Sequence, residues 1–235
     1  MAGKLRLCFA DTETSGLAES VEDAIANDRQ VIEYCFKVWE EGSIKRSIVR
    51  RVMPTGDALH DAVDCAKAGY NRFNPDEWWT RVGFTEHGRA KPWCKEDREN
   101  VSEFLQGETL AGSNPRFDLI MLKAEFARDR RLEDFPKLAT HRMMNTGDLA
   151  WLLWSVRLVD KTGLETLTKL LGIEHKAHTA EGDVDACIKV FETMCDTLVG
   201  GPRKLKRLCE AIIDTLDDEA DRTFARDALG KVRVL

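Results

Sequence analysis

Residues 5–17 read LRLCFADTETSGL, and this stretch decides the fold. Leu5 to Ala10 alternates and is rich in strand formers, which predicts a β-strand that ends at Asp11. On an extended chain the side chains of Asp11 and Glu13 leave the same face, because they lie two residues apart. Two carboxylates on one face can hold a hard cation, which prefers oxygen ligands. Solvated turn residues are the alternative interpretation of this pair.

Strand and helix patterns continue along the chain. Two further strand candidates are Val31–Trp39 and Ile44–Met53, separated by a hairpin signal, and residues 54–92 are expected to form an ordered loop with short helices. The elements expected after it are helices at Lys95–Gln106, Asp118–Arg130, Leu149–Val156, Leu164–Leu171 and Val184–Leu198, and a strand at Thr109–Ser113. An antiparallel meander followed by strand–helix units predicts an α/β fold with a mixed sheet flanked by helices.

The composition narrows the class of protein. The chain has 235 residues, 43% of them hydrophobic, which suits one domain with a small extension. We expect a cytoplasmic protein, because no run approaches the ~18 apolar residues that span a bilayer and no signal peptide is recognisable. Seven cysteines without a C-x-x-C pair are expected to be reduced rather than in disulfides or a zinc site. The net charge of −6 argues against a broad basic surface, but not against an enzyme acting on nucleic acid.

A third acid lies in Asn114-Pro-Arg-Phe-Asp118, directly after the strand at Thr109–Ser113. Asp118 shares a helical face with Met121 and Leu122, so that face must turn inward. An acid there is costly to bury unless a metal or a hydrogen-bond donor satisfies it. A first-turn acid favoured by the helix dipole is the alternative interpretation.

The fourth acid lies in His178-Thr-Ala-Glu-Gly-Asp183. Asp183 precedes Cys187 by one helical turn and so lies on the apolar side of its helix, whereas Asp185 does not and is expected to be solvated. His178 lies just before this helix, where its imidazole could reach a water, although a lone histidine is more often an ordinary residue. Inward-facing acids at three element boundaries together predict one metal cluster.

These three motifs resemble those of the DnaQ-like DEDDh 3′–5′ exonuclease superfamily, whose members have an RNase H-like fold. The family motif D-x-E is matched by Asp11 and Glu13, N-x-x-F-D by Asn114, Phe117 and Asp118, and H-x4-D by His178 and Asp183. The match runs in the family's order over roughly residues 5–198. Between Leu17 and Val31 the linker looks longer than is usual in the family, and it borders the expected substrate cleft.

The resemblance implies a five-stranded mixed sheet, with an antiparallel meander followed by parallel strands. It also implies two Mg²⁺ or Mn²⁺ ions held by Asp11, Glu13, Asp118 and Asp183. His178 would take a proton from the attacking water, and nucleoside 5′-monophosphates would be released from 3′ ends. The residues implied in substrate binding are Thr12, Thr14, Leu17, Asn114 and Phe117. For Leu17 and Phe117, packing in the core is the alternative.

The sequence defines the substrate and the partners less closely than it defines the metal-binding acids. Single-stranded DNA or RNA 3′ ends are the expected ligands, and an RNA-trimming exoribonuclease or a non-catalytic binding module are the alternatives. The basic residues Lys45, Arg46, Arg50 and Arg51 are interpreted either as following a phosphate backbone or as a solvated strand face.

The domain boundary is expected near the Gly200-Gly201-Pro202 break. Residues 1–199 would form the exonuclease domain, and residues 200–235 a helical C-terminal extension. The extension has a narrow apolar stripe of Leu205, Leu208, Ile212 and Leu216. That stripe would pack on the catalytic domain or, alternatively, mediate homodimerisation or docking to a replication partner.

Overall fold

The computed structural model describes residues 5–76, 90–149 and 163–200, with residues 207–211, 213–214, 222–223 and 226 near the C-terminus. The chain divides into two compact units. The first consists of Met1–Met144 and Lys176–Val184, and the second of Asn145–His175 and Asp185–Leu235. Every residue predicted for the active site lies in the first unit. The division does not follow the predicted boundary at residues 199 and 200, which stays a prediction.

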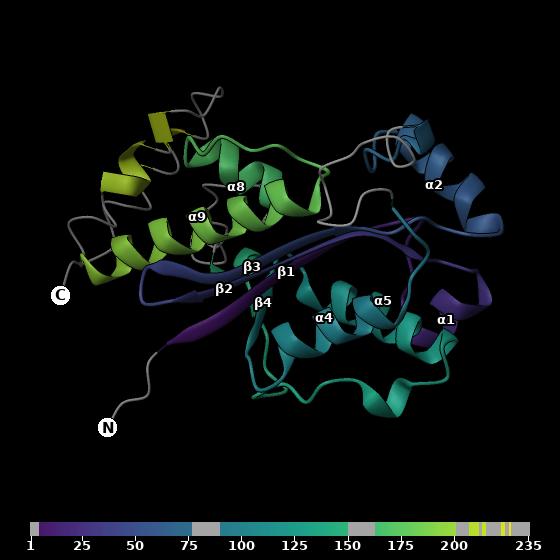
Figure 1. Cartoon of the computed structure of the whole chain (residues 1–235). Coiled ribbons are helices and arrows are strands. Elements are labelled where there is room, and N and C mark those ends of the chain that lie inside the picture. Colours follow the sequence, from purple (N-terminus) through teal and green to yellow (C-terminus); the bar gives the residue numbers. More distant parts are fainter. Residues whose placement is uncertain are drawn as a thin grey trace. The chain divides into compact units, whose positions relative to one another are not determined.

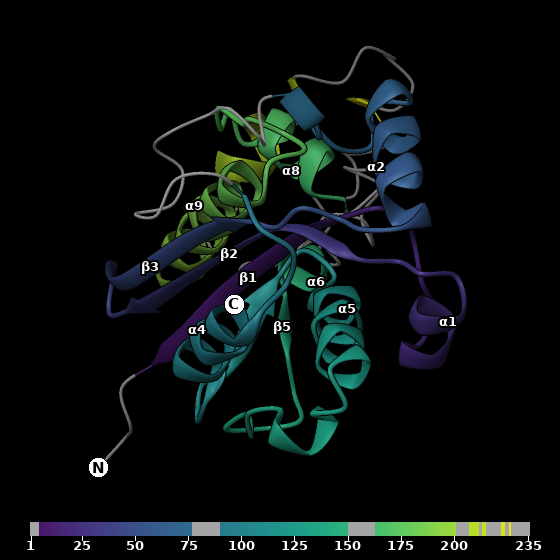
Figure 2. The ribbon, with the colours of Figure 1, turned by 45° about the vertical axis from the view of Figure 1, so that its right-hand side comes forward.

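The strands form a five-stranded mixed sheet with the order β3-β2-β1-β4-β5 (Figures 1 and 2). The strands are β1 (Arg6–Thr14), β2 (Val31–Glu40), β3 (Ser43–Arg51), β4 (Leu110–Gly112) and β5 (Met144–Asn145). The first three form an antiparallel meander, and β4 runs parallel to β1. The predicted α/β class with a mixed sheet is therefore confirmed. The predicted end of the first strand at Asp11 is wrong, because pairing with β2 continues to Thr14.

Helices α1 (Val21–Ala26), α4 (Lys95–Leu105) and α5 (Pro115–Arg128) lie on one side of this sheet (Figures 1 and 2). Side chains with even numbers on β1 and β2 point toward α4 and α5 and form the main core. Its buried members include Cys8, Ala10, Tyr34, Phe36, Val101, Phe104, Leu110, Met121, Leu122 and Phe126. Odd-numbered positions such as Asp11 and Glu13 therefore face the opposite side.

A β-bulge interrupts this alternation next to Glu13. Glu13 lies opposite Glu33 and Thr14 lies opposite Val31, so Ile32 is the extra residue in β2. Val31 consequently joins the main core, whereas Ile32 joins a second buried cluster with Met53, Ala62 and Phe73. Helix α2 (Asp57–Lys67) packs on this second cluster and accounts for part of the segment predicted as loop with short helices. Residues 77–89 of that segment lie outside the described part of the chain.

The observed helices differ from the predicted ones mainly at their starts. Helix α5 begins at Pro115, where proline suits the first helical position, rather than at Asp118. Helix α9 (Ala180–Val199) begins four residues earlier than predicted, so Asp183 lies in its first turn. Helix α1 occupies the segment that the sequence suggested was a linker. The remaining short elements are the 3-10 helix η1 (Leu132–Asp134), α6 (Thr146–Leu149) and α8 (Leu164–Leu170).

Several other predictions concern segments that are only partly described. The predicted helix Leu149–Val156 lies almost wholly in residues 150–162, which are not described. In the C-terminal segment, Cys209 and Ile213 are buried and Leu208 is partly buried, while Leu205, Ile212 and Leu216 of the predicted stripe lie outside the described residues. All seven cysteines lie within the described part, where none of them forms a disulfide. Among the described helices, none combines the length and apolar character needed to cross a membrane.

The main core yields a stability prediction at Phe126. This side chain is 1% exposed and packs edge-on against Phe135, with 5.1 Å between the ring centroids. Phe126→Ala should lower the free energy of unfolding by about 3–5 kcal/mol, because a large buried side chain leaves a cavity. Leu132→Ala, at a position that is 44% exposed, should change it by less than about 0.5 kcal/mol. Urea denaturation of both variants tests this pair, and equal effects would contradict the assigned core.

Candidate metal centre

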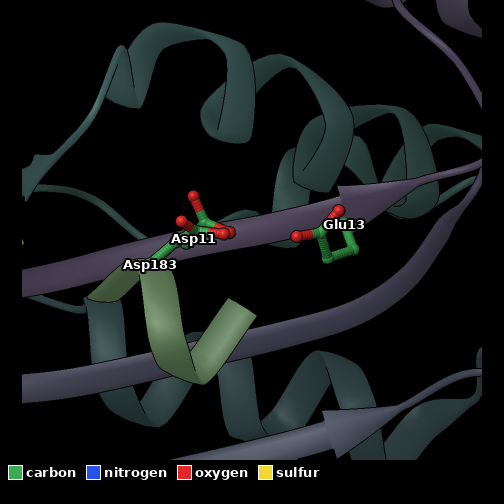
Figure 3. A group of neighbouring side chains, drawn as sticks. All are labelled: Asp11, Glu13 and Asp183. Atoms are coloured by element: carbon green, nitrogen blue, oxygen red, sulfur yellow. The ribbon is translucent and has the colours of Figure 1, made fainter. Parts of the chain in front are cut away.

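Three of the four predicted acids come together on the sheet face opposite α4 and α5. Asp11 and Glu13 rise from β1, and Asp183 reaches them from the first turn of α9 (Figure 3). One carboxylate oxygen from each lies within 4.8 Å of the others. The structure therefore brings together residues that are up to 172 positions apart (183 − 11).

Asp118 lies beside this group but is held by a different contact. Its Oδ1 accepts hydrogen bonds from the backbone N and the Oγ1 of Thr12, both at 2.7 Å. β4 ends at Gly112 and pairs with β1 only as far as Phe9. No residue of β4 therefore pairs with Thr12, and the Thr12 N–H can donate to Asp118. Asp118 is not one of the three acids whose oxygens lie within 4.8 Å of one another. Its charge nevertheless raises the pKa of Asp11, so the two carboxyl groups are neighbours.

Two glycines allow the chain to pass close to this group. A Cβ at Gly112 would lie 2.6 Å from the carbonyl oxygen of Ala10, so β4 can approach β1 there only with a glycine. At Gly182 a Cβ would collide with the carbonyl oxygen of Lys176. The first glycine lets α5 start close to β1, and the second lets the 176–179 turn fold tightly against the start of α9.

His178 lies in that turn. Its backbone is in the left-handed region, with φ of 63°, and its backbone N donates a hydrogen bond of 3.0 Å to Oδ2 of Asp183. The residue is exposed. His178 and Asp183 are thus joined through the backbone, which leaves the imidazole to act on something other than Asp183.

Three of the carboxyl groups, Asp11, Glu13 and Asp118, have raised pKa values. Burial raises the pKa of Asp11 well above its usual range, and the charges of Asp118 and Asp183 raise it further. Burial, then the charges of Asp183 and Glu33, and a hydrogen bond with Asp183 raise the pKa of Glu13 to about 9. Burial also raises the pKa of Asp118 to about 7, although the Thr12 hydrogen bonds oppose the shift.

These features fit a divalent metal ion. The converging ligand atoms are all carboxylate oxygens, which Mg²⁺ and Mn²⁺ prefer. A bound cation would replace the repulsion among buried like charges with attraction. Asp11, Glu13 and Asp183 are placed to hold such an ion directly, and Asp118 lies beside them.

Thr12 and Phe117, predicted to bind substrate, are engaged with the protein itself. The Thr12 hydroxyl donates to Asp118, and Phe117 packs against the main core. Asn114 lies at the start of α5 with a left-handed backbone, φ of 57°. A contact between any of these three residues and substrate stays a prediction.

Thr14 is the last residue of β1, and Leu17 lies in the loop that follows it. The Thr14 hydroxyl donates to the carbonyl oxygen of Gly16 at 2.9 Å, and Asn71 donates to the carbonyl oxygen of Thr14 at 3.0 Å. Leu17 is 84% exposed, so the alternative that it packs in the core is wrong.

The three arginines of β3 form ion pairs with acids of the protein. The ion pairs are Arg46 with Glu103 at 3.4 Å, Arg50 with Glu96 at 3.0 Å and Arg51 with Glu33 at 3.1 Å. Lys45 is exposed. This distribution gives no support to a phosphate-binding strand built from the three arginines.

Glu33 and Lys37 are buried near the site and were not identified from the sequence. Both lie on β2, on the same face as Asp11 and Glu13. The available signal was the presence of two charged residues, four apart, in the otherwise apolar segment VIEYCFKVW. That pattern alone gives no indication of what they contact.

The raised pKa values predict how stability depends on pH without metal. An acid with a raised pKa in the folded state stabilises the fold below its unfolded pKa, and this contribution is lost as the pH rises through the folded value. With a chelator present, thermal stability should therefore fall between pH 4.5 and about 9, and less steeply in Glu13→Gln. Added Mn²⁺ should restore stability most at the alkaline end. A wild-type profile parallel to that of Glu13→Gln, with no effect of Mn²⁺, would contradict the assigned cluster.

No protein-family model matches the chain, and no curated protein matches it.

Proposed function

We propose that the chain is a metal-dependent 3′–5′ exonuclease with an RNase H-like fold, which hydrolyses the terminal phosphodiester of DNA and releases nucleoside 5′-monophosphates. The convergence of Asp11, Glu13 and Asp183 within 4.8 Å is the observation that carries this proposal. The order of the motifs, their resemblance to the DEDDh pattern and the antiparallel meander followed by a parallel strand support it. Asp118, buried beside Asp11, supplies the fourth acid of that pattern.

The four carboxylates would hold two Mg²⁺ or Mn²⁺ ions. When bound, such ions supply Lewis-acid activation of water and neutralise charge that develops on the phosphate. Thr12 keeps Asp118 oriented by donating two hydrogen bonds to a single oxygen, Oδ1. The other oxygen of Asp118 would then be turned to the metal-binding face.

His178 is the proposed general base. Its backbone N–H is fixed to Asp183, so its ring extends from a defined turn beside the cluster. The ring would accept the proton of the water that attacks the terminal phosphorus atom. The bond between that phosphorus and the 3′ oxygen of the preceding nucleotide breaks, and a 3′-hydroxyl is left on the shortened strand.

Leu17 is proposed to select strand ends. The loop that carries it is fixed by hydrogen bonds from Ser15 N to the Gln30 carbonyl oxygen and from Gln30 N to the Ser15 hydroxyl, both 2.9 Å long. A large apolar side chain that is 84% exposed on a braced loop can stack on the last base without reading its identity. Such stacking suits an enzyme that removes nucleotides of any sequence.

Removal of single carboxylates tests the catalytic assignment. Asp11→Asn, Asp118→Asn and Asp183→Asn should each lower the rate of Mg²⁺-dependent nucleotide release by at least ~10²-fold while the circular dichroism spectrum stays that of the wild type. Asp185→Asn is the matched control, because it neutralises an acid two residues beyond Asp183 on the same helix. It should retain the wild-type rate. A wild-type rate in any of the first three variants would remove that residue from the site.

His178→Ala separates proton transfer from metal binding. The turnover number should fall by about 10²–10⁴-fold, which is the usual contribution of a general base. Mn²⁺ affinity measured by calorimetry should stay close to that of the wild type, because the His178 ring is not part of the carboxylate group. A parallel loss of Mn²⁺ affinity would make His178 a metal ligand instead.

A further inference from the structure

We propose that Glu33 is a positioning residue that fixes the first turn of α9 to β2 and so sets where Asp183 stands relative to Asp11 and Glu13. This inference rests on the proposed function for its catalytic consequence. The tether itself is a property of the fold and can be tested without turnover.

Glu33 is 4% exposed and lies directly opposite Glu13 in the β1–β2 register. Its two oxygens have different partners. Oε1 accepts a hydrogen bond of 3.1 Å from Nε of Arg51, and Oε2 accepts one of 3.0 Å from the backbone N of Ala180. Ala180 is the first residue of α9 and is fully buried. The carboxylate thus joins β3 to the start of the helix that carries Asp183.

Ala180 N–H belongs to the first turn of α9, where backbone donors have no partner within the helix. A carboxylate is also favoured at that end by the helix dipole. Glu33 satisfies both conditions from 147 residues away in sequence. The bond therefore selects where the start of the helix stands on the sheet.

A second contact strengthens the attachment. Lys37, four residues from Glu33 and on the same face of β2, donates from Nζ to Oε1 of Glu181 at 3.3 Å. Two consecutive residues of α9 are thereby attached to β2. Asp183 lies two residues after Glu181 in the same turn, where its carboxylate lies close to those of Asp11 and Glu13. β1 supplies two of the three acids, and the neighbouring strand β2 holds the helix that supplies the third, Asp183.

Glutamine cannot replace Glu33 in this arrangement. An amide offers a single acceptor oxygen, whereas Arg51 and Ala180 donate to two different oxygens of Glu33. In Glu33→Gln the amide NH₂ would therefore face one of the two donors. When a group that holds a metal ligand in place is replaced, the metal affinity commonly falls by about 10–100-fold.

The test compares Glu33→Gln with Arg50→Gln in the full-length chain. Arg50→Gln removes the ion pairs of β3 with Glu96 and Asp97 of α4, which do not involve α9. Calorimetric titration with Mn²⁺ should show an affinity about 10–100-fold weaker for Glu33→Gln and unchanged for Arg50→Gln. Hydrogen exchange should be faster at residues 180–184 in Glu33→Gln alone, with β1 and β2 unchanged.

Two results would overturn the proposal. One is a folded Glu33→Gln protein with wild-type Mn²⁺ affinity and wild-type exchange at residues 180–184. The other is exchange that rises equally over the whole sheet in both variants, which would make Glu33 a general stabilising residue. If Glu33→Gln does not fold, Lys37→Met tests the second contact and should likewise speed hydrogen exchange at residues 180–184, whereas unchanged exchange there would contradict the attachment. Wild-type protein that binds no Mn²⁺ would defeat the proposed function, while the exchange comparison would still decide the tether.

Discussion

Repulsion among four carboxyl groups near the end of β1, two of them buried and two half-buried, is the constraint on which the rest of the site depends. The pKa values of Asp11, Glu13 and Asp118 are raised by burial and by the charges of neighbouring acids. Asp118 is held by two donors of Thr12, and Asp183 by the backbone of His178. These contacts fix the acids in place but supply no full positive charge. A bound cation would relieve this repulsion, and the proposed chemistry rests on that proposal.

The sheet divides this task between adjacent strands. β1 extends beyond the residues that pair with β4, so the backbone N of Thr12 can donate to Asp118. Asp11 and Glu13, at odd-numbered positions, face the side of the sheet away from α4 and α5. β2 carries the buried charges that attach the start of α9. The bulge at Ile32 adjoins Glu33 and directs the Ile32 side chain into the second buried cluster. Bulges are frequent beside functional sites because they redirect side chains locally.

Local sequence patterns predicted the features that depend on near neighbours. The alternation at Leu5–Ala10 located β1, and the strand candidate Val31–Trp39 located β2. The two-residue spacing put Asp11 and Glu13 on one face. The extension of β1 through its acids was missed, because it depends on pairing with β2. Helix α1 was missed although Ser20 caps it by accepting from Asp23 N, a signal that the sequence contained. The Glu33–Ala180 bond could not be predicted, since no local pattern links residues so far apart.

The most direct test of the central claim is the product pattern from a 5′-labelled single-stranded DNA with a free 3′-hydroxyl, compared with the matched RNA and with circular single-stranded DNA. The account predicts that, with Mg²⁺ or Mn²⁺, the linear DNA is shortened one nucleotide at a time from its 3′ end and nucleoside 5′-monophosphates accumulate. The circle should stay intact, because it has no end. Faster shortening of the RNA would assign the same site to an exoribonuclease. Cleavage of the circle, or no metal-dependent release from either linear strand, would contradict the account.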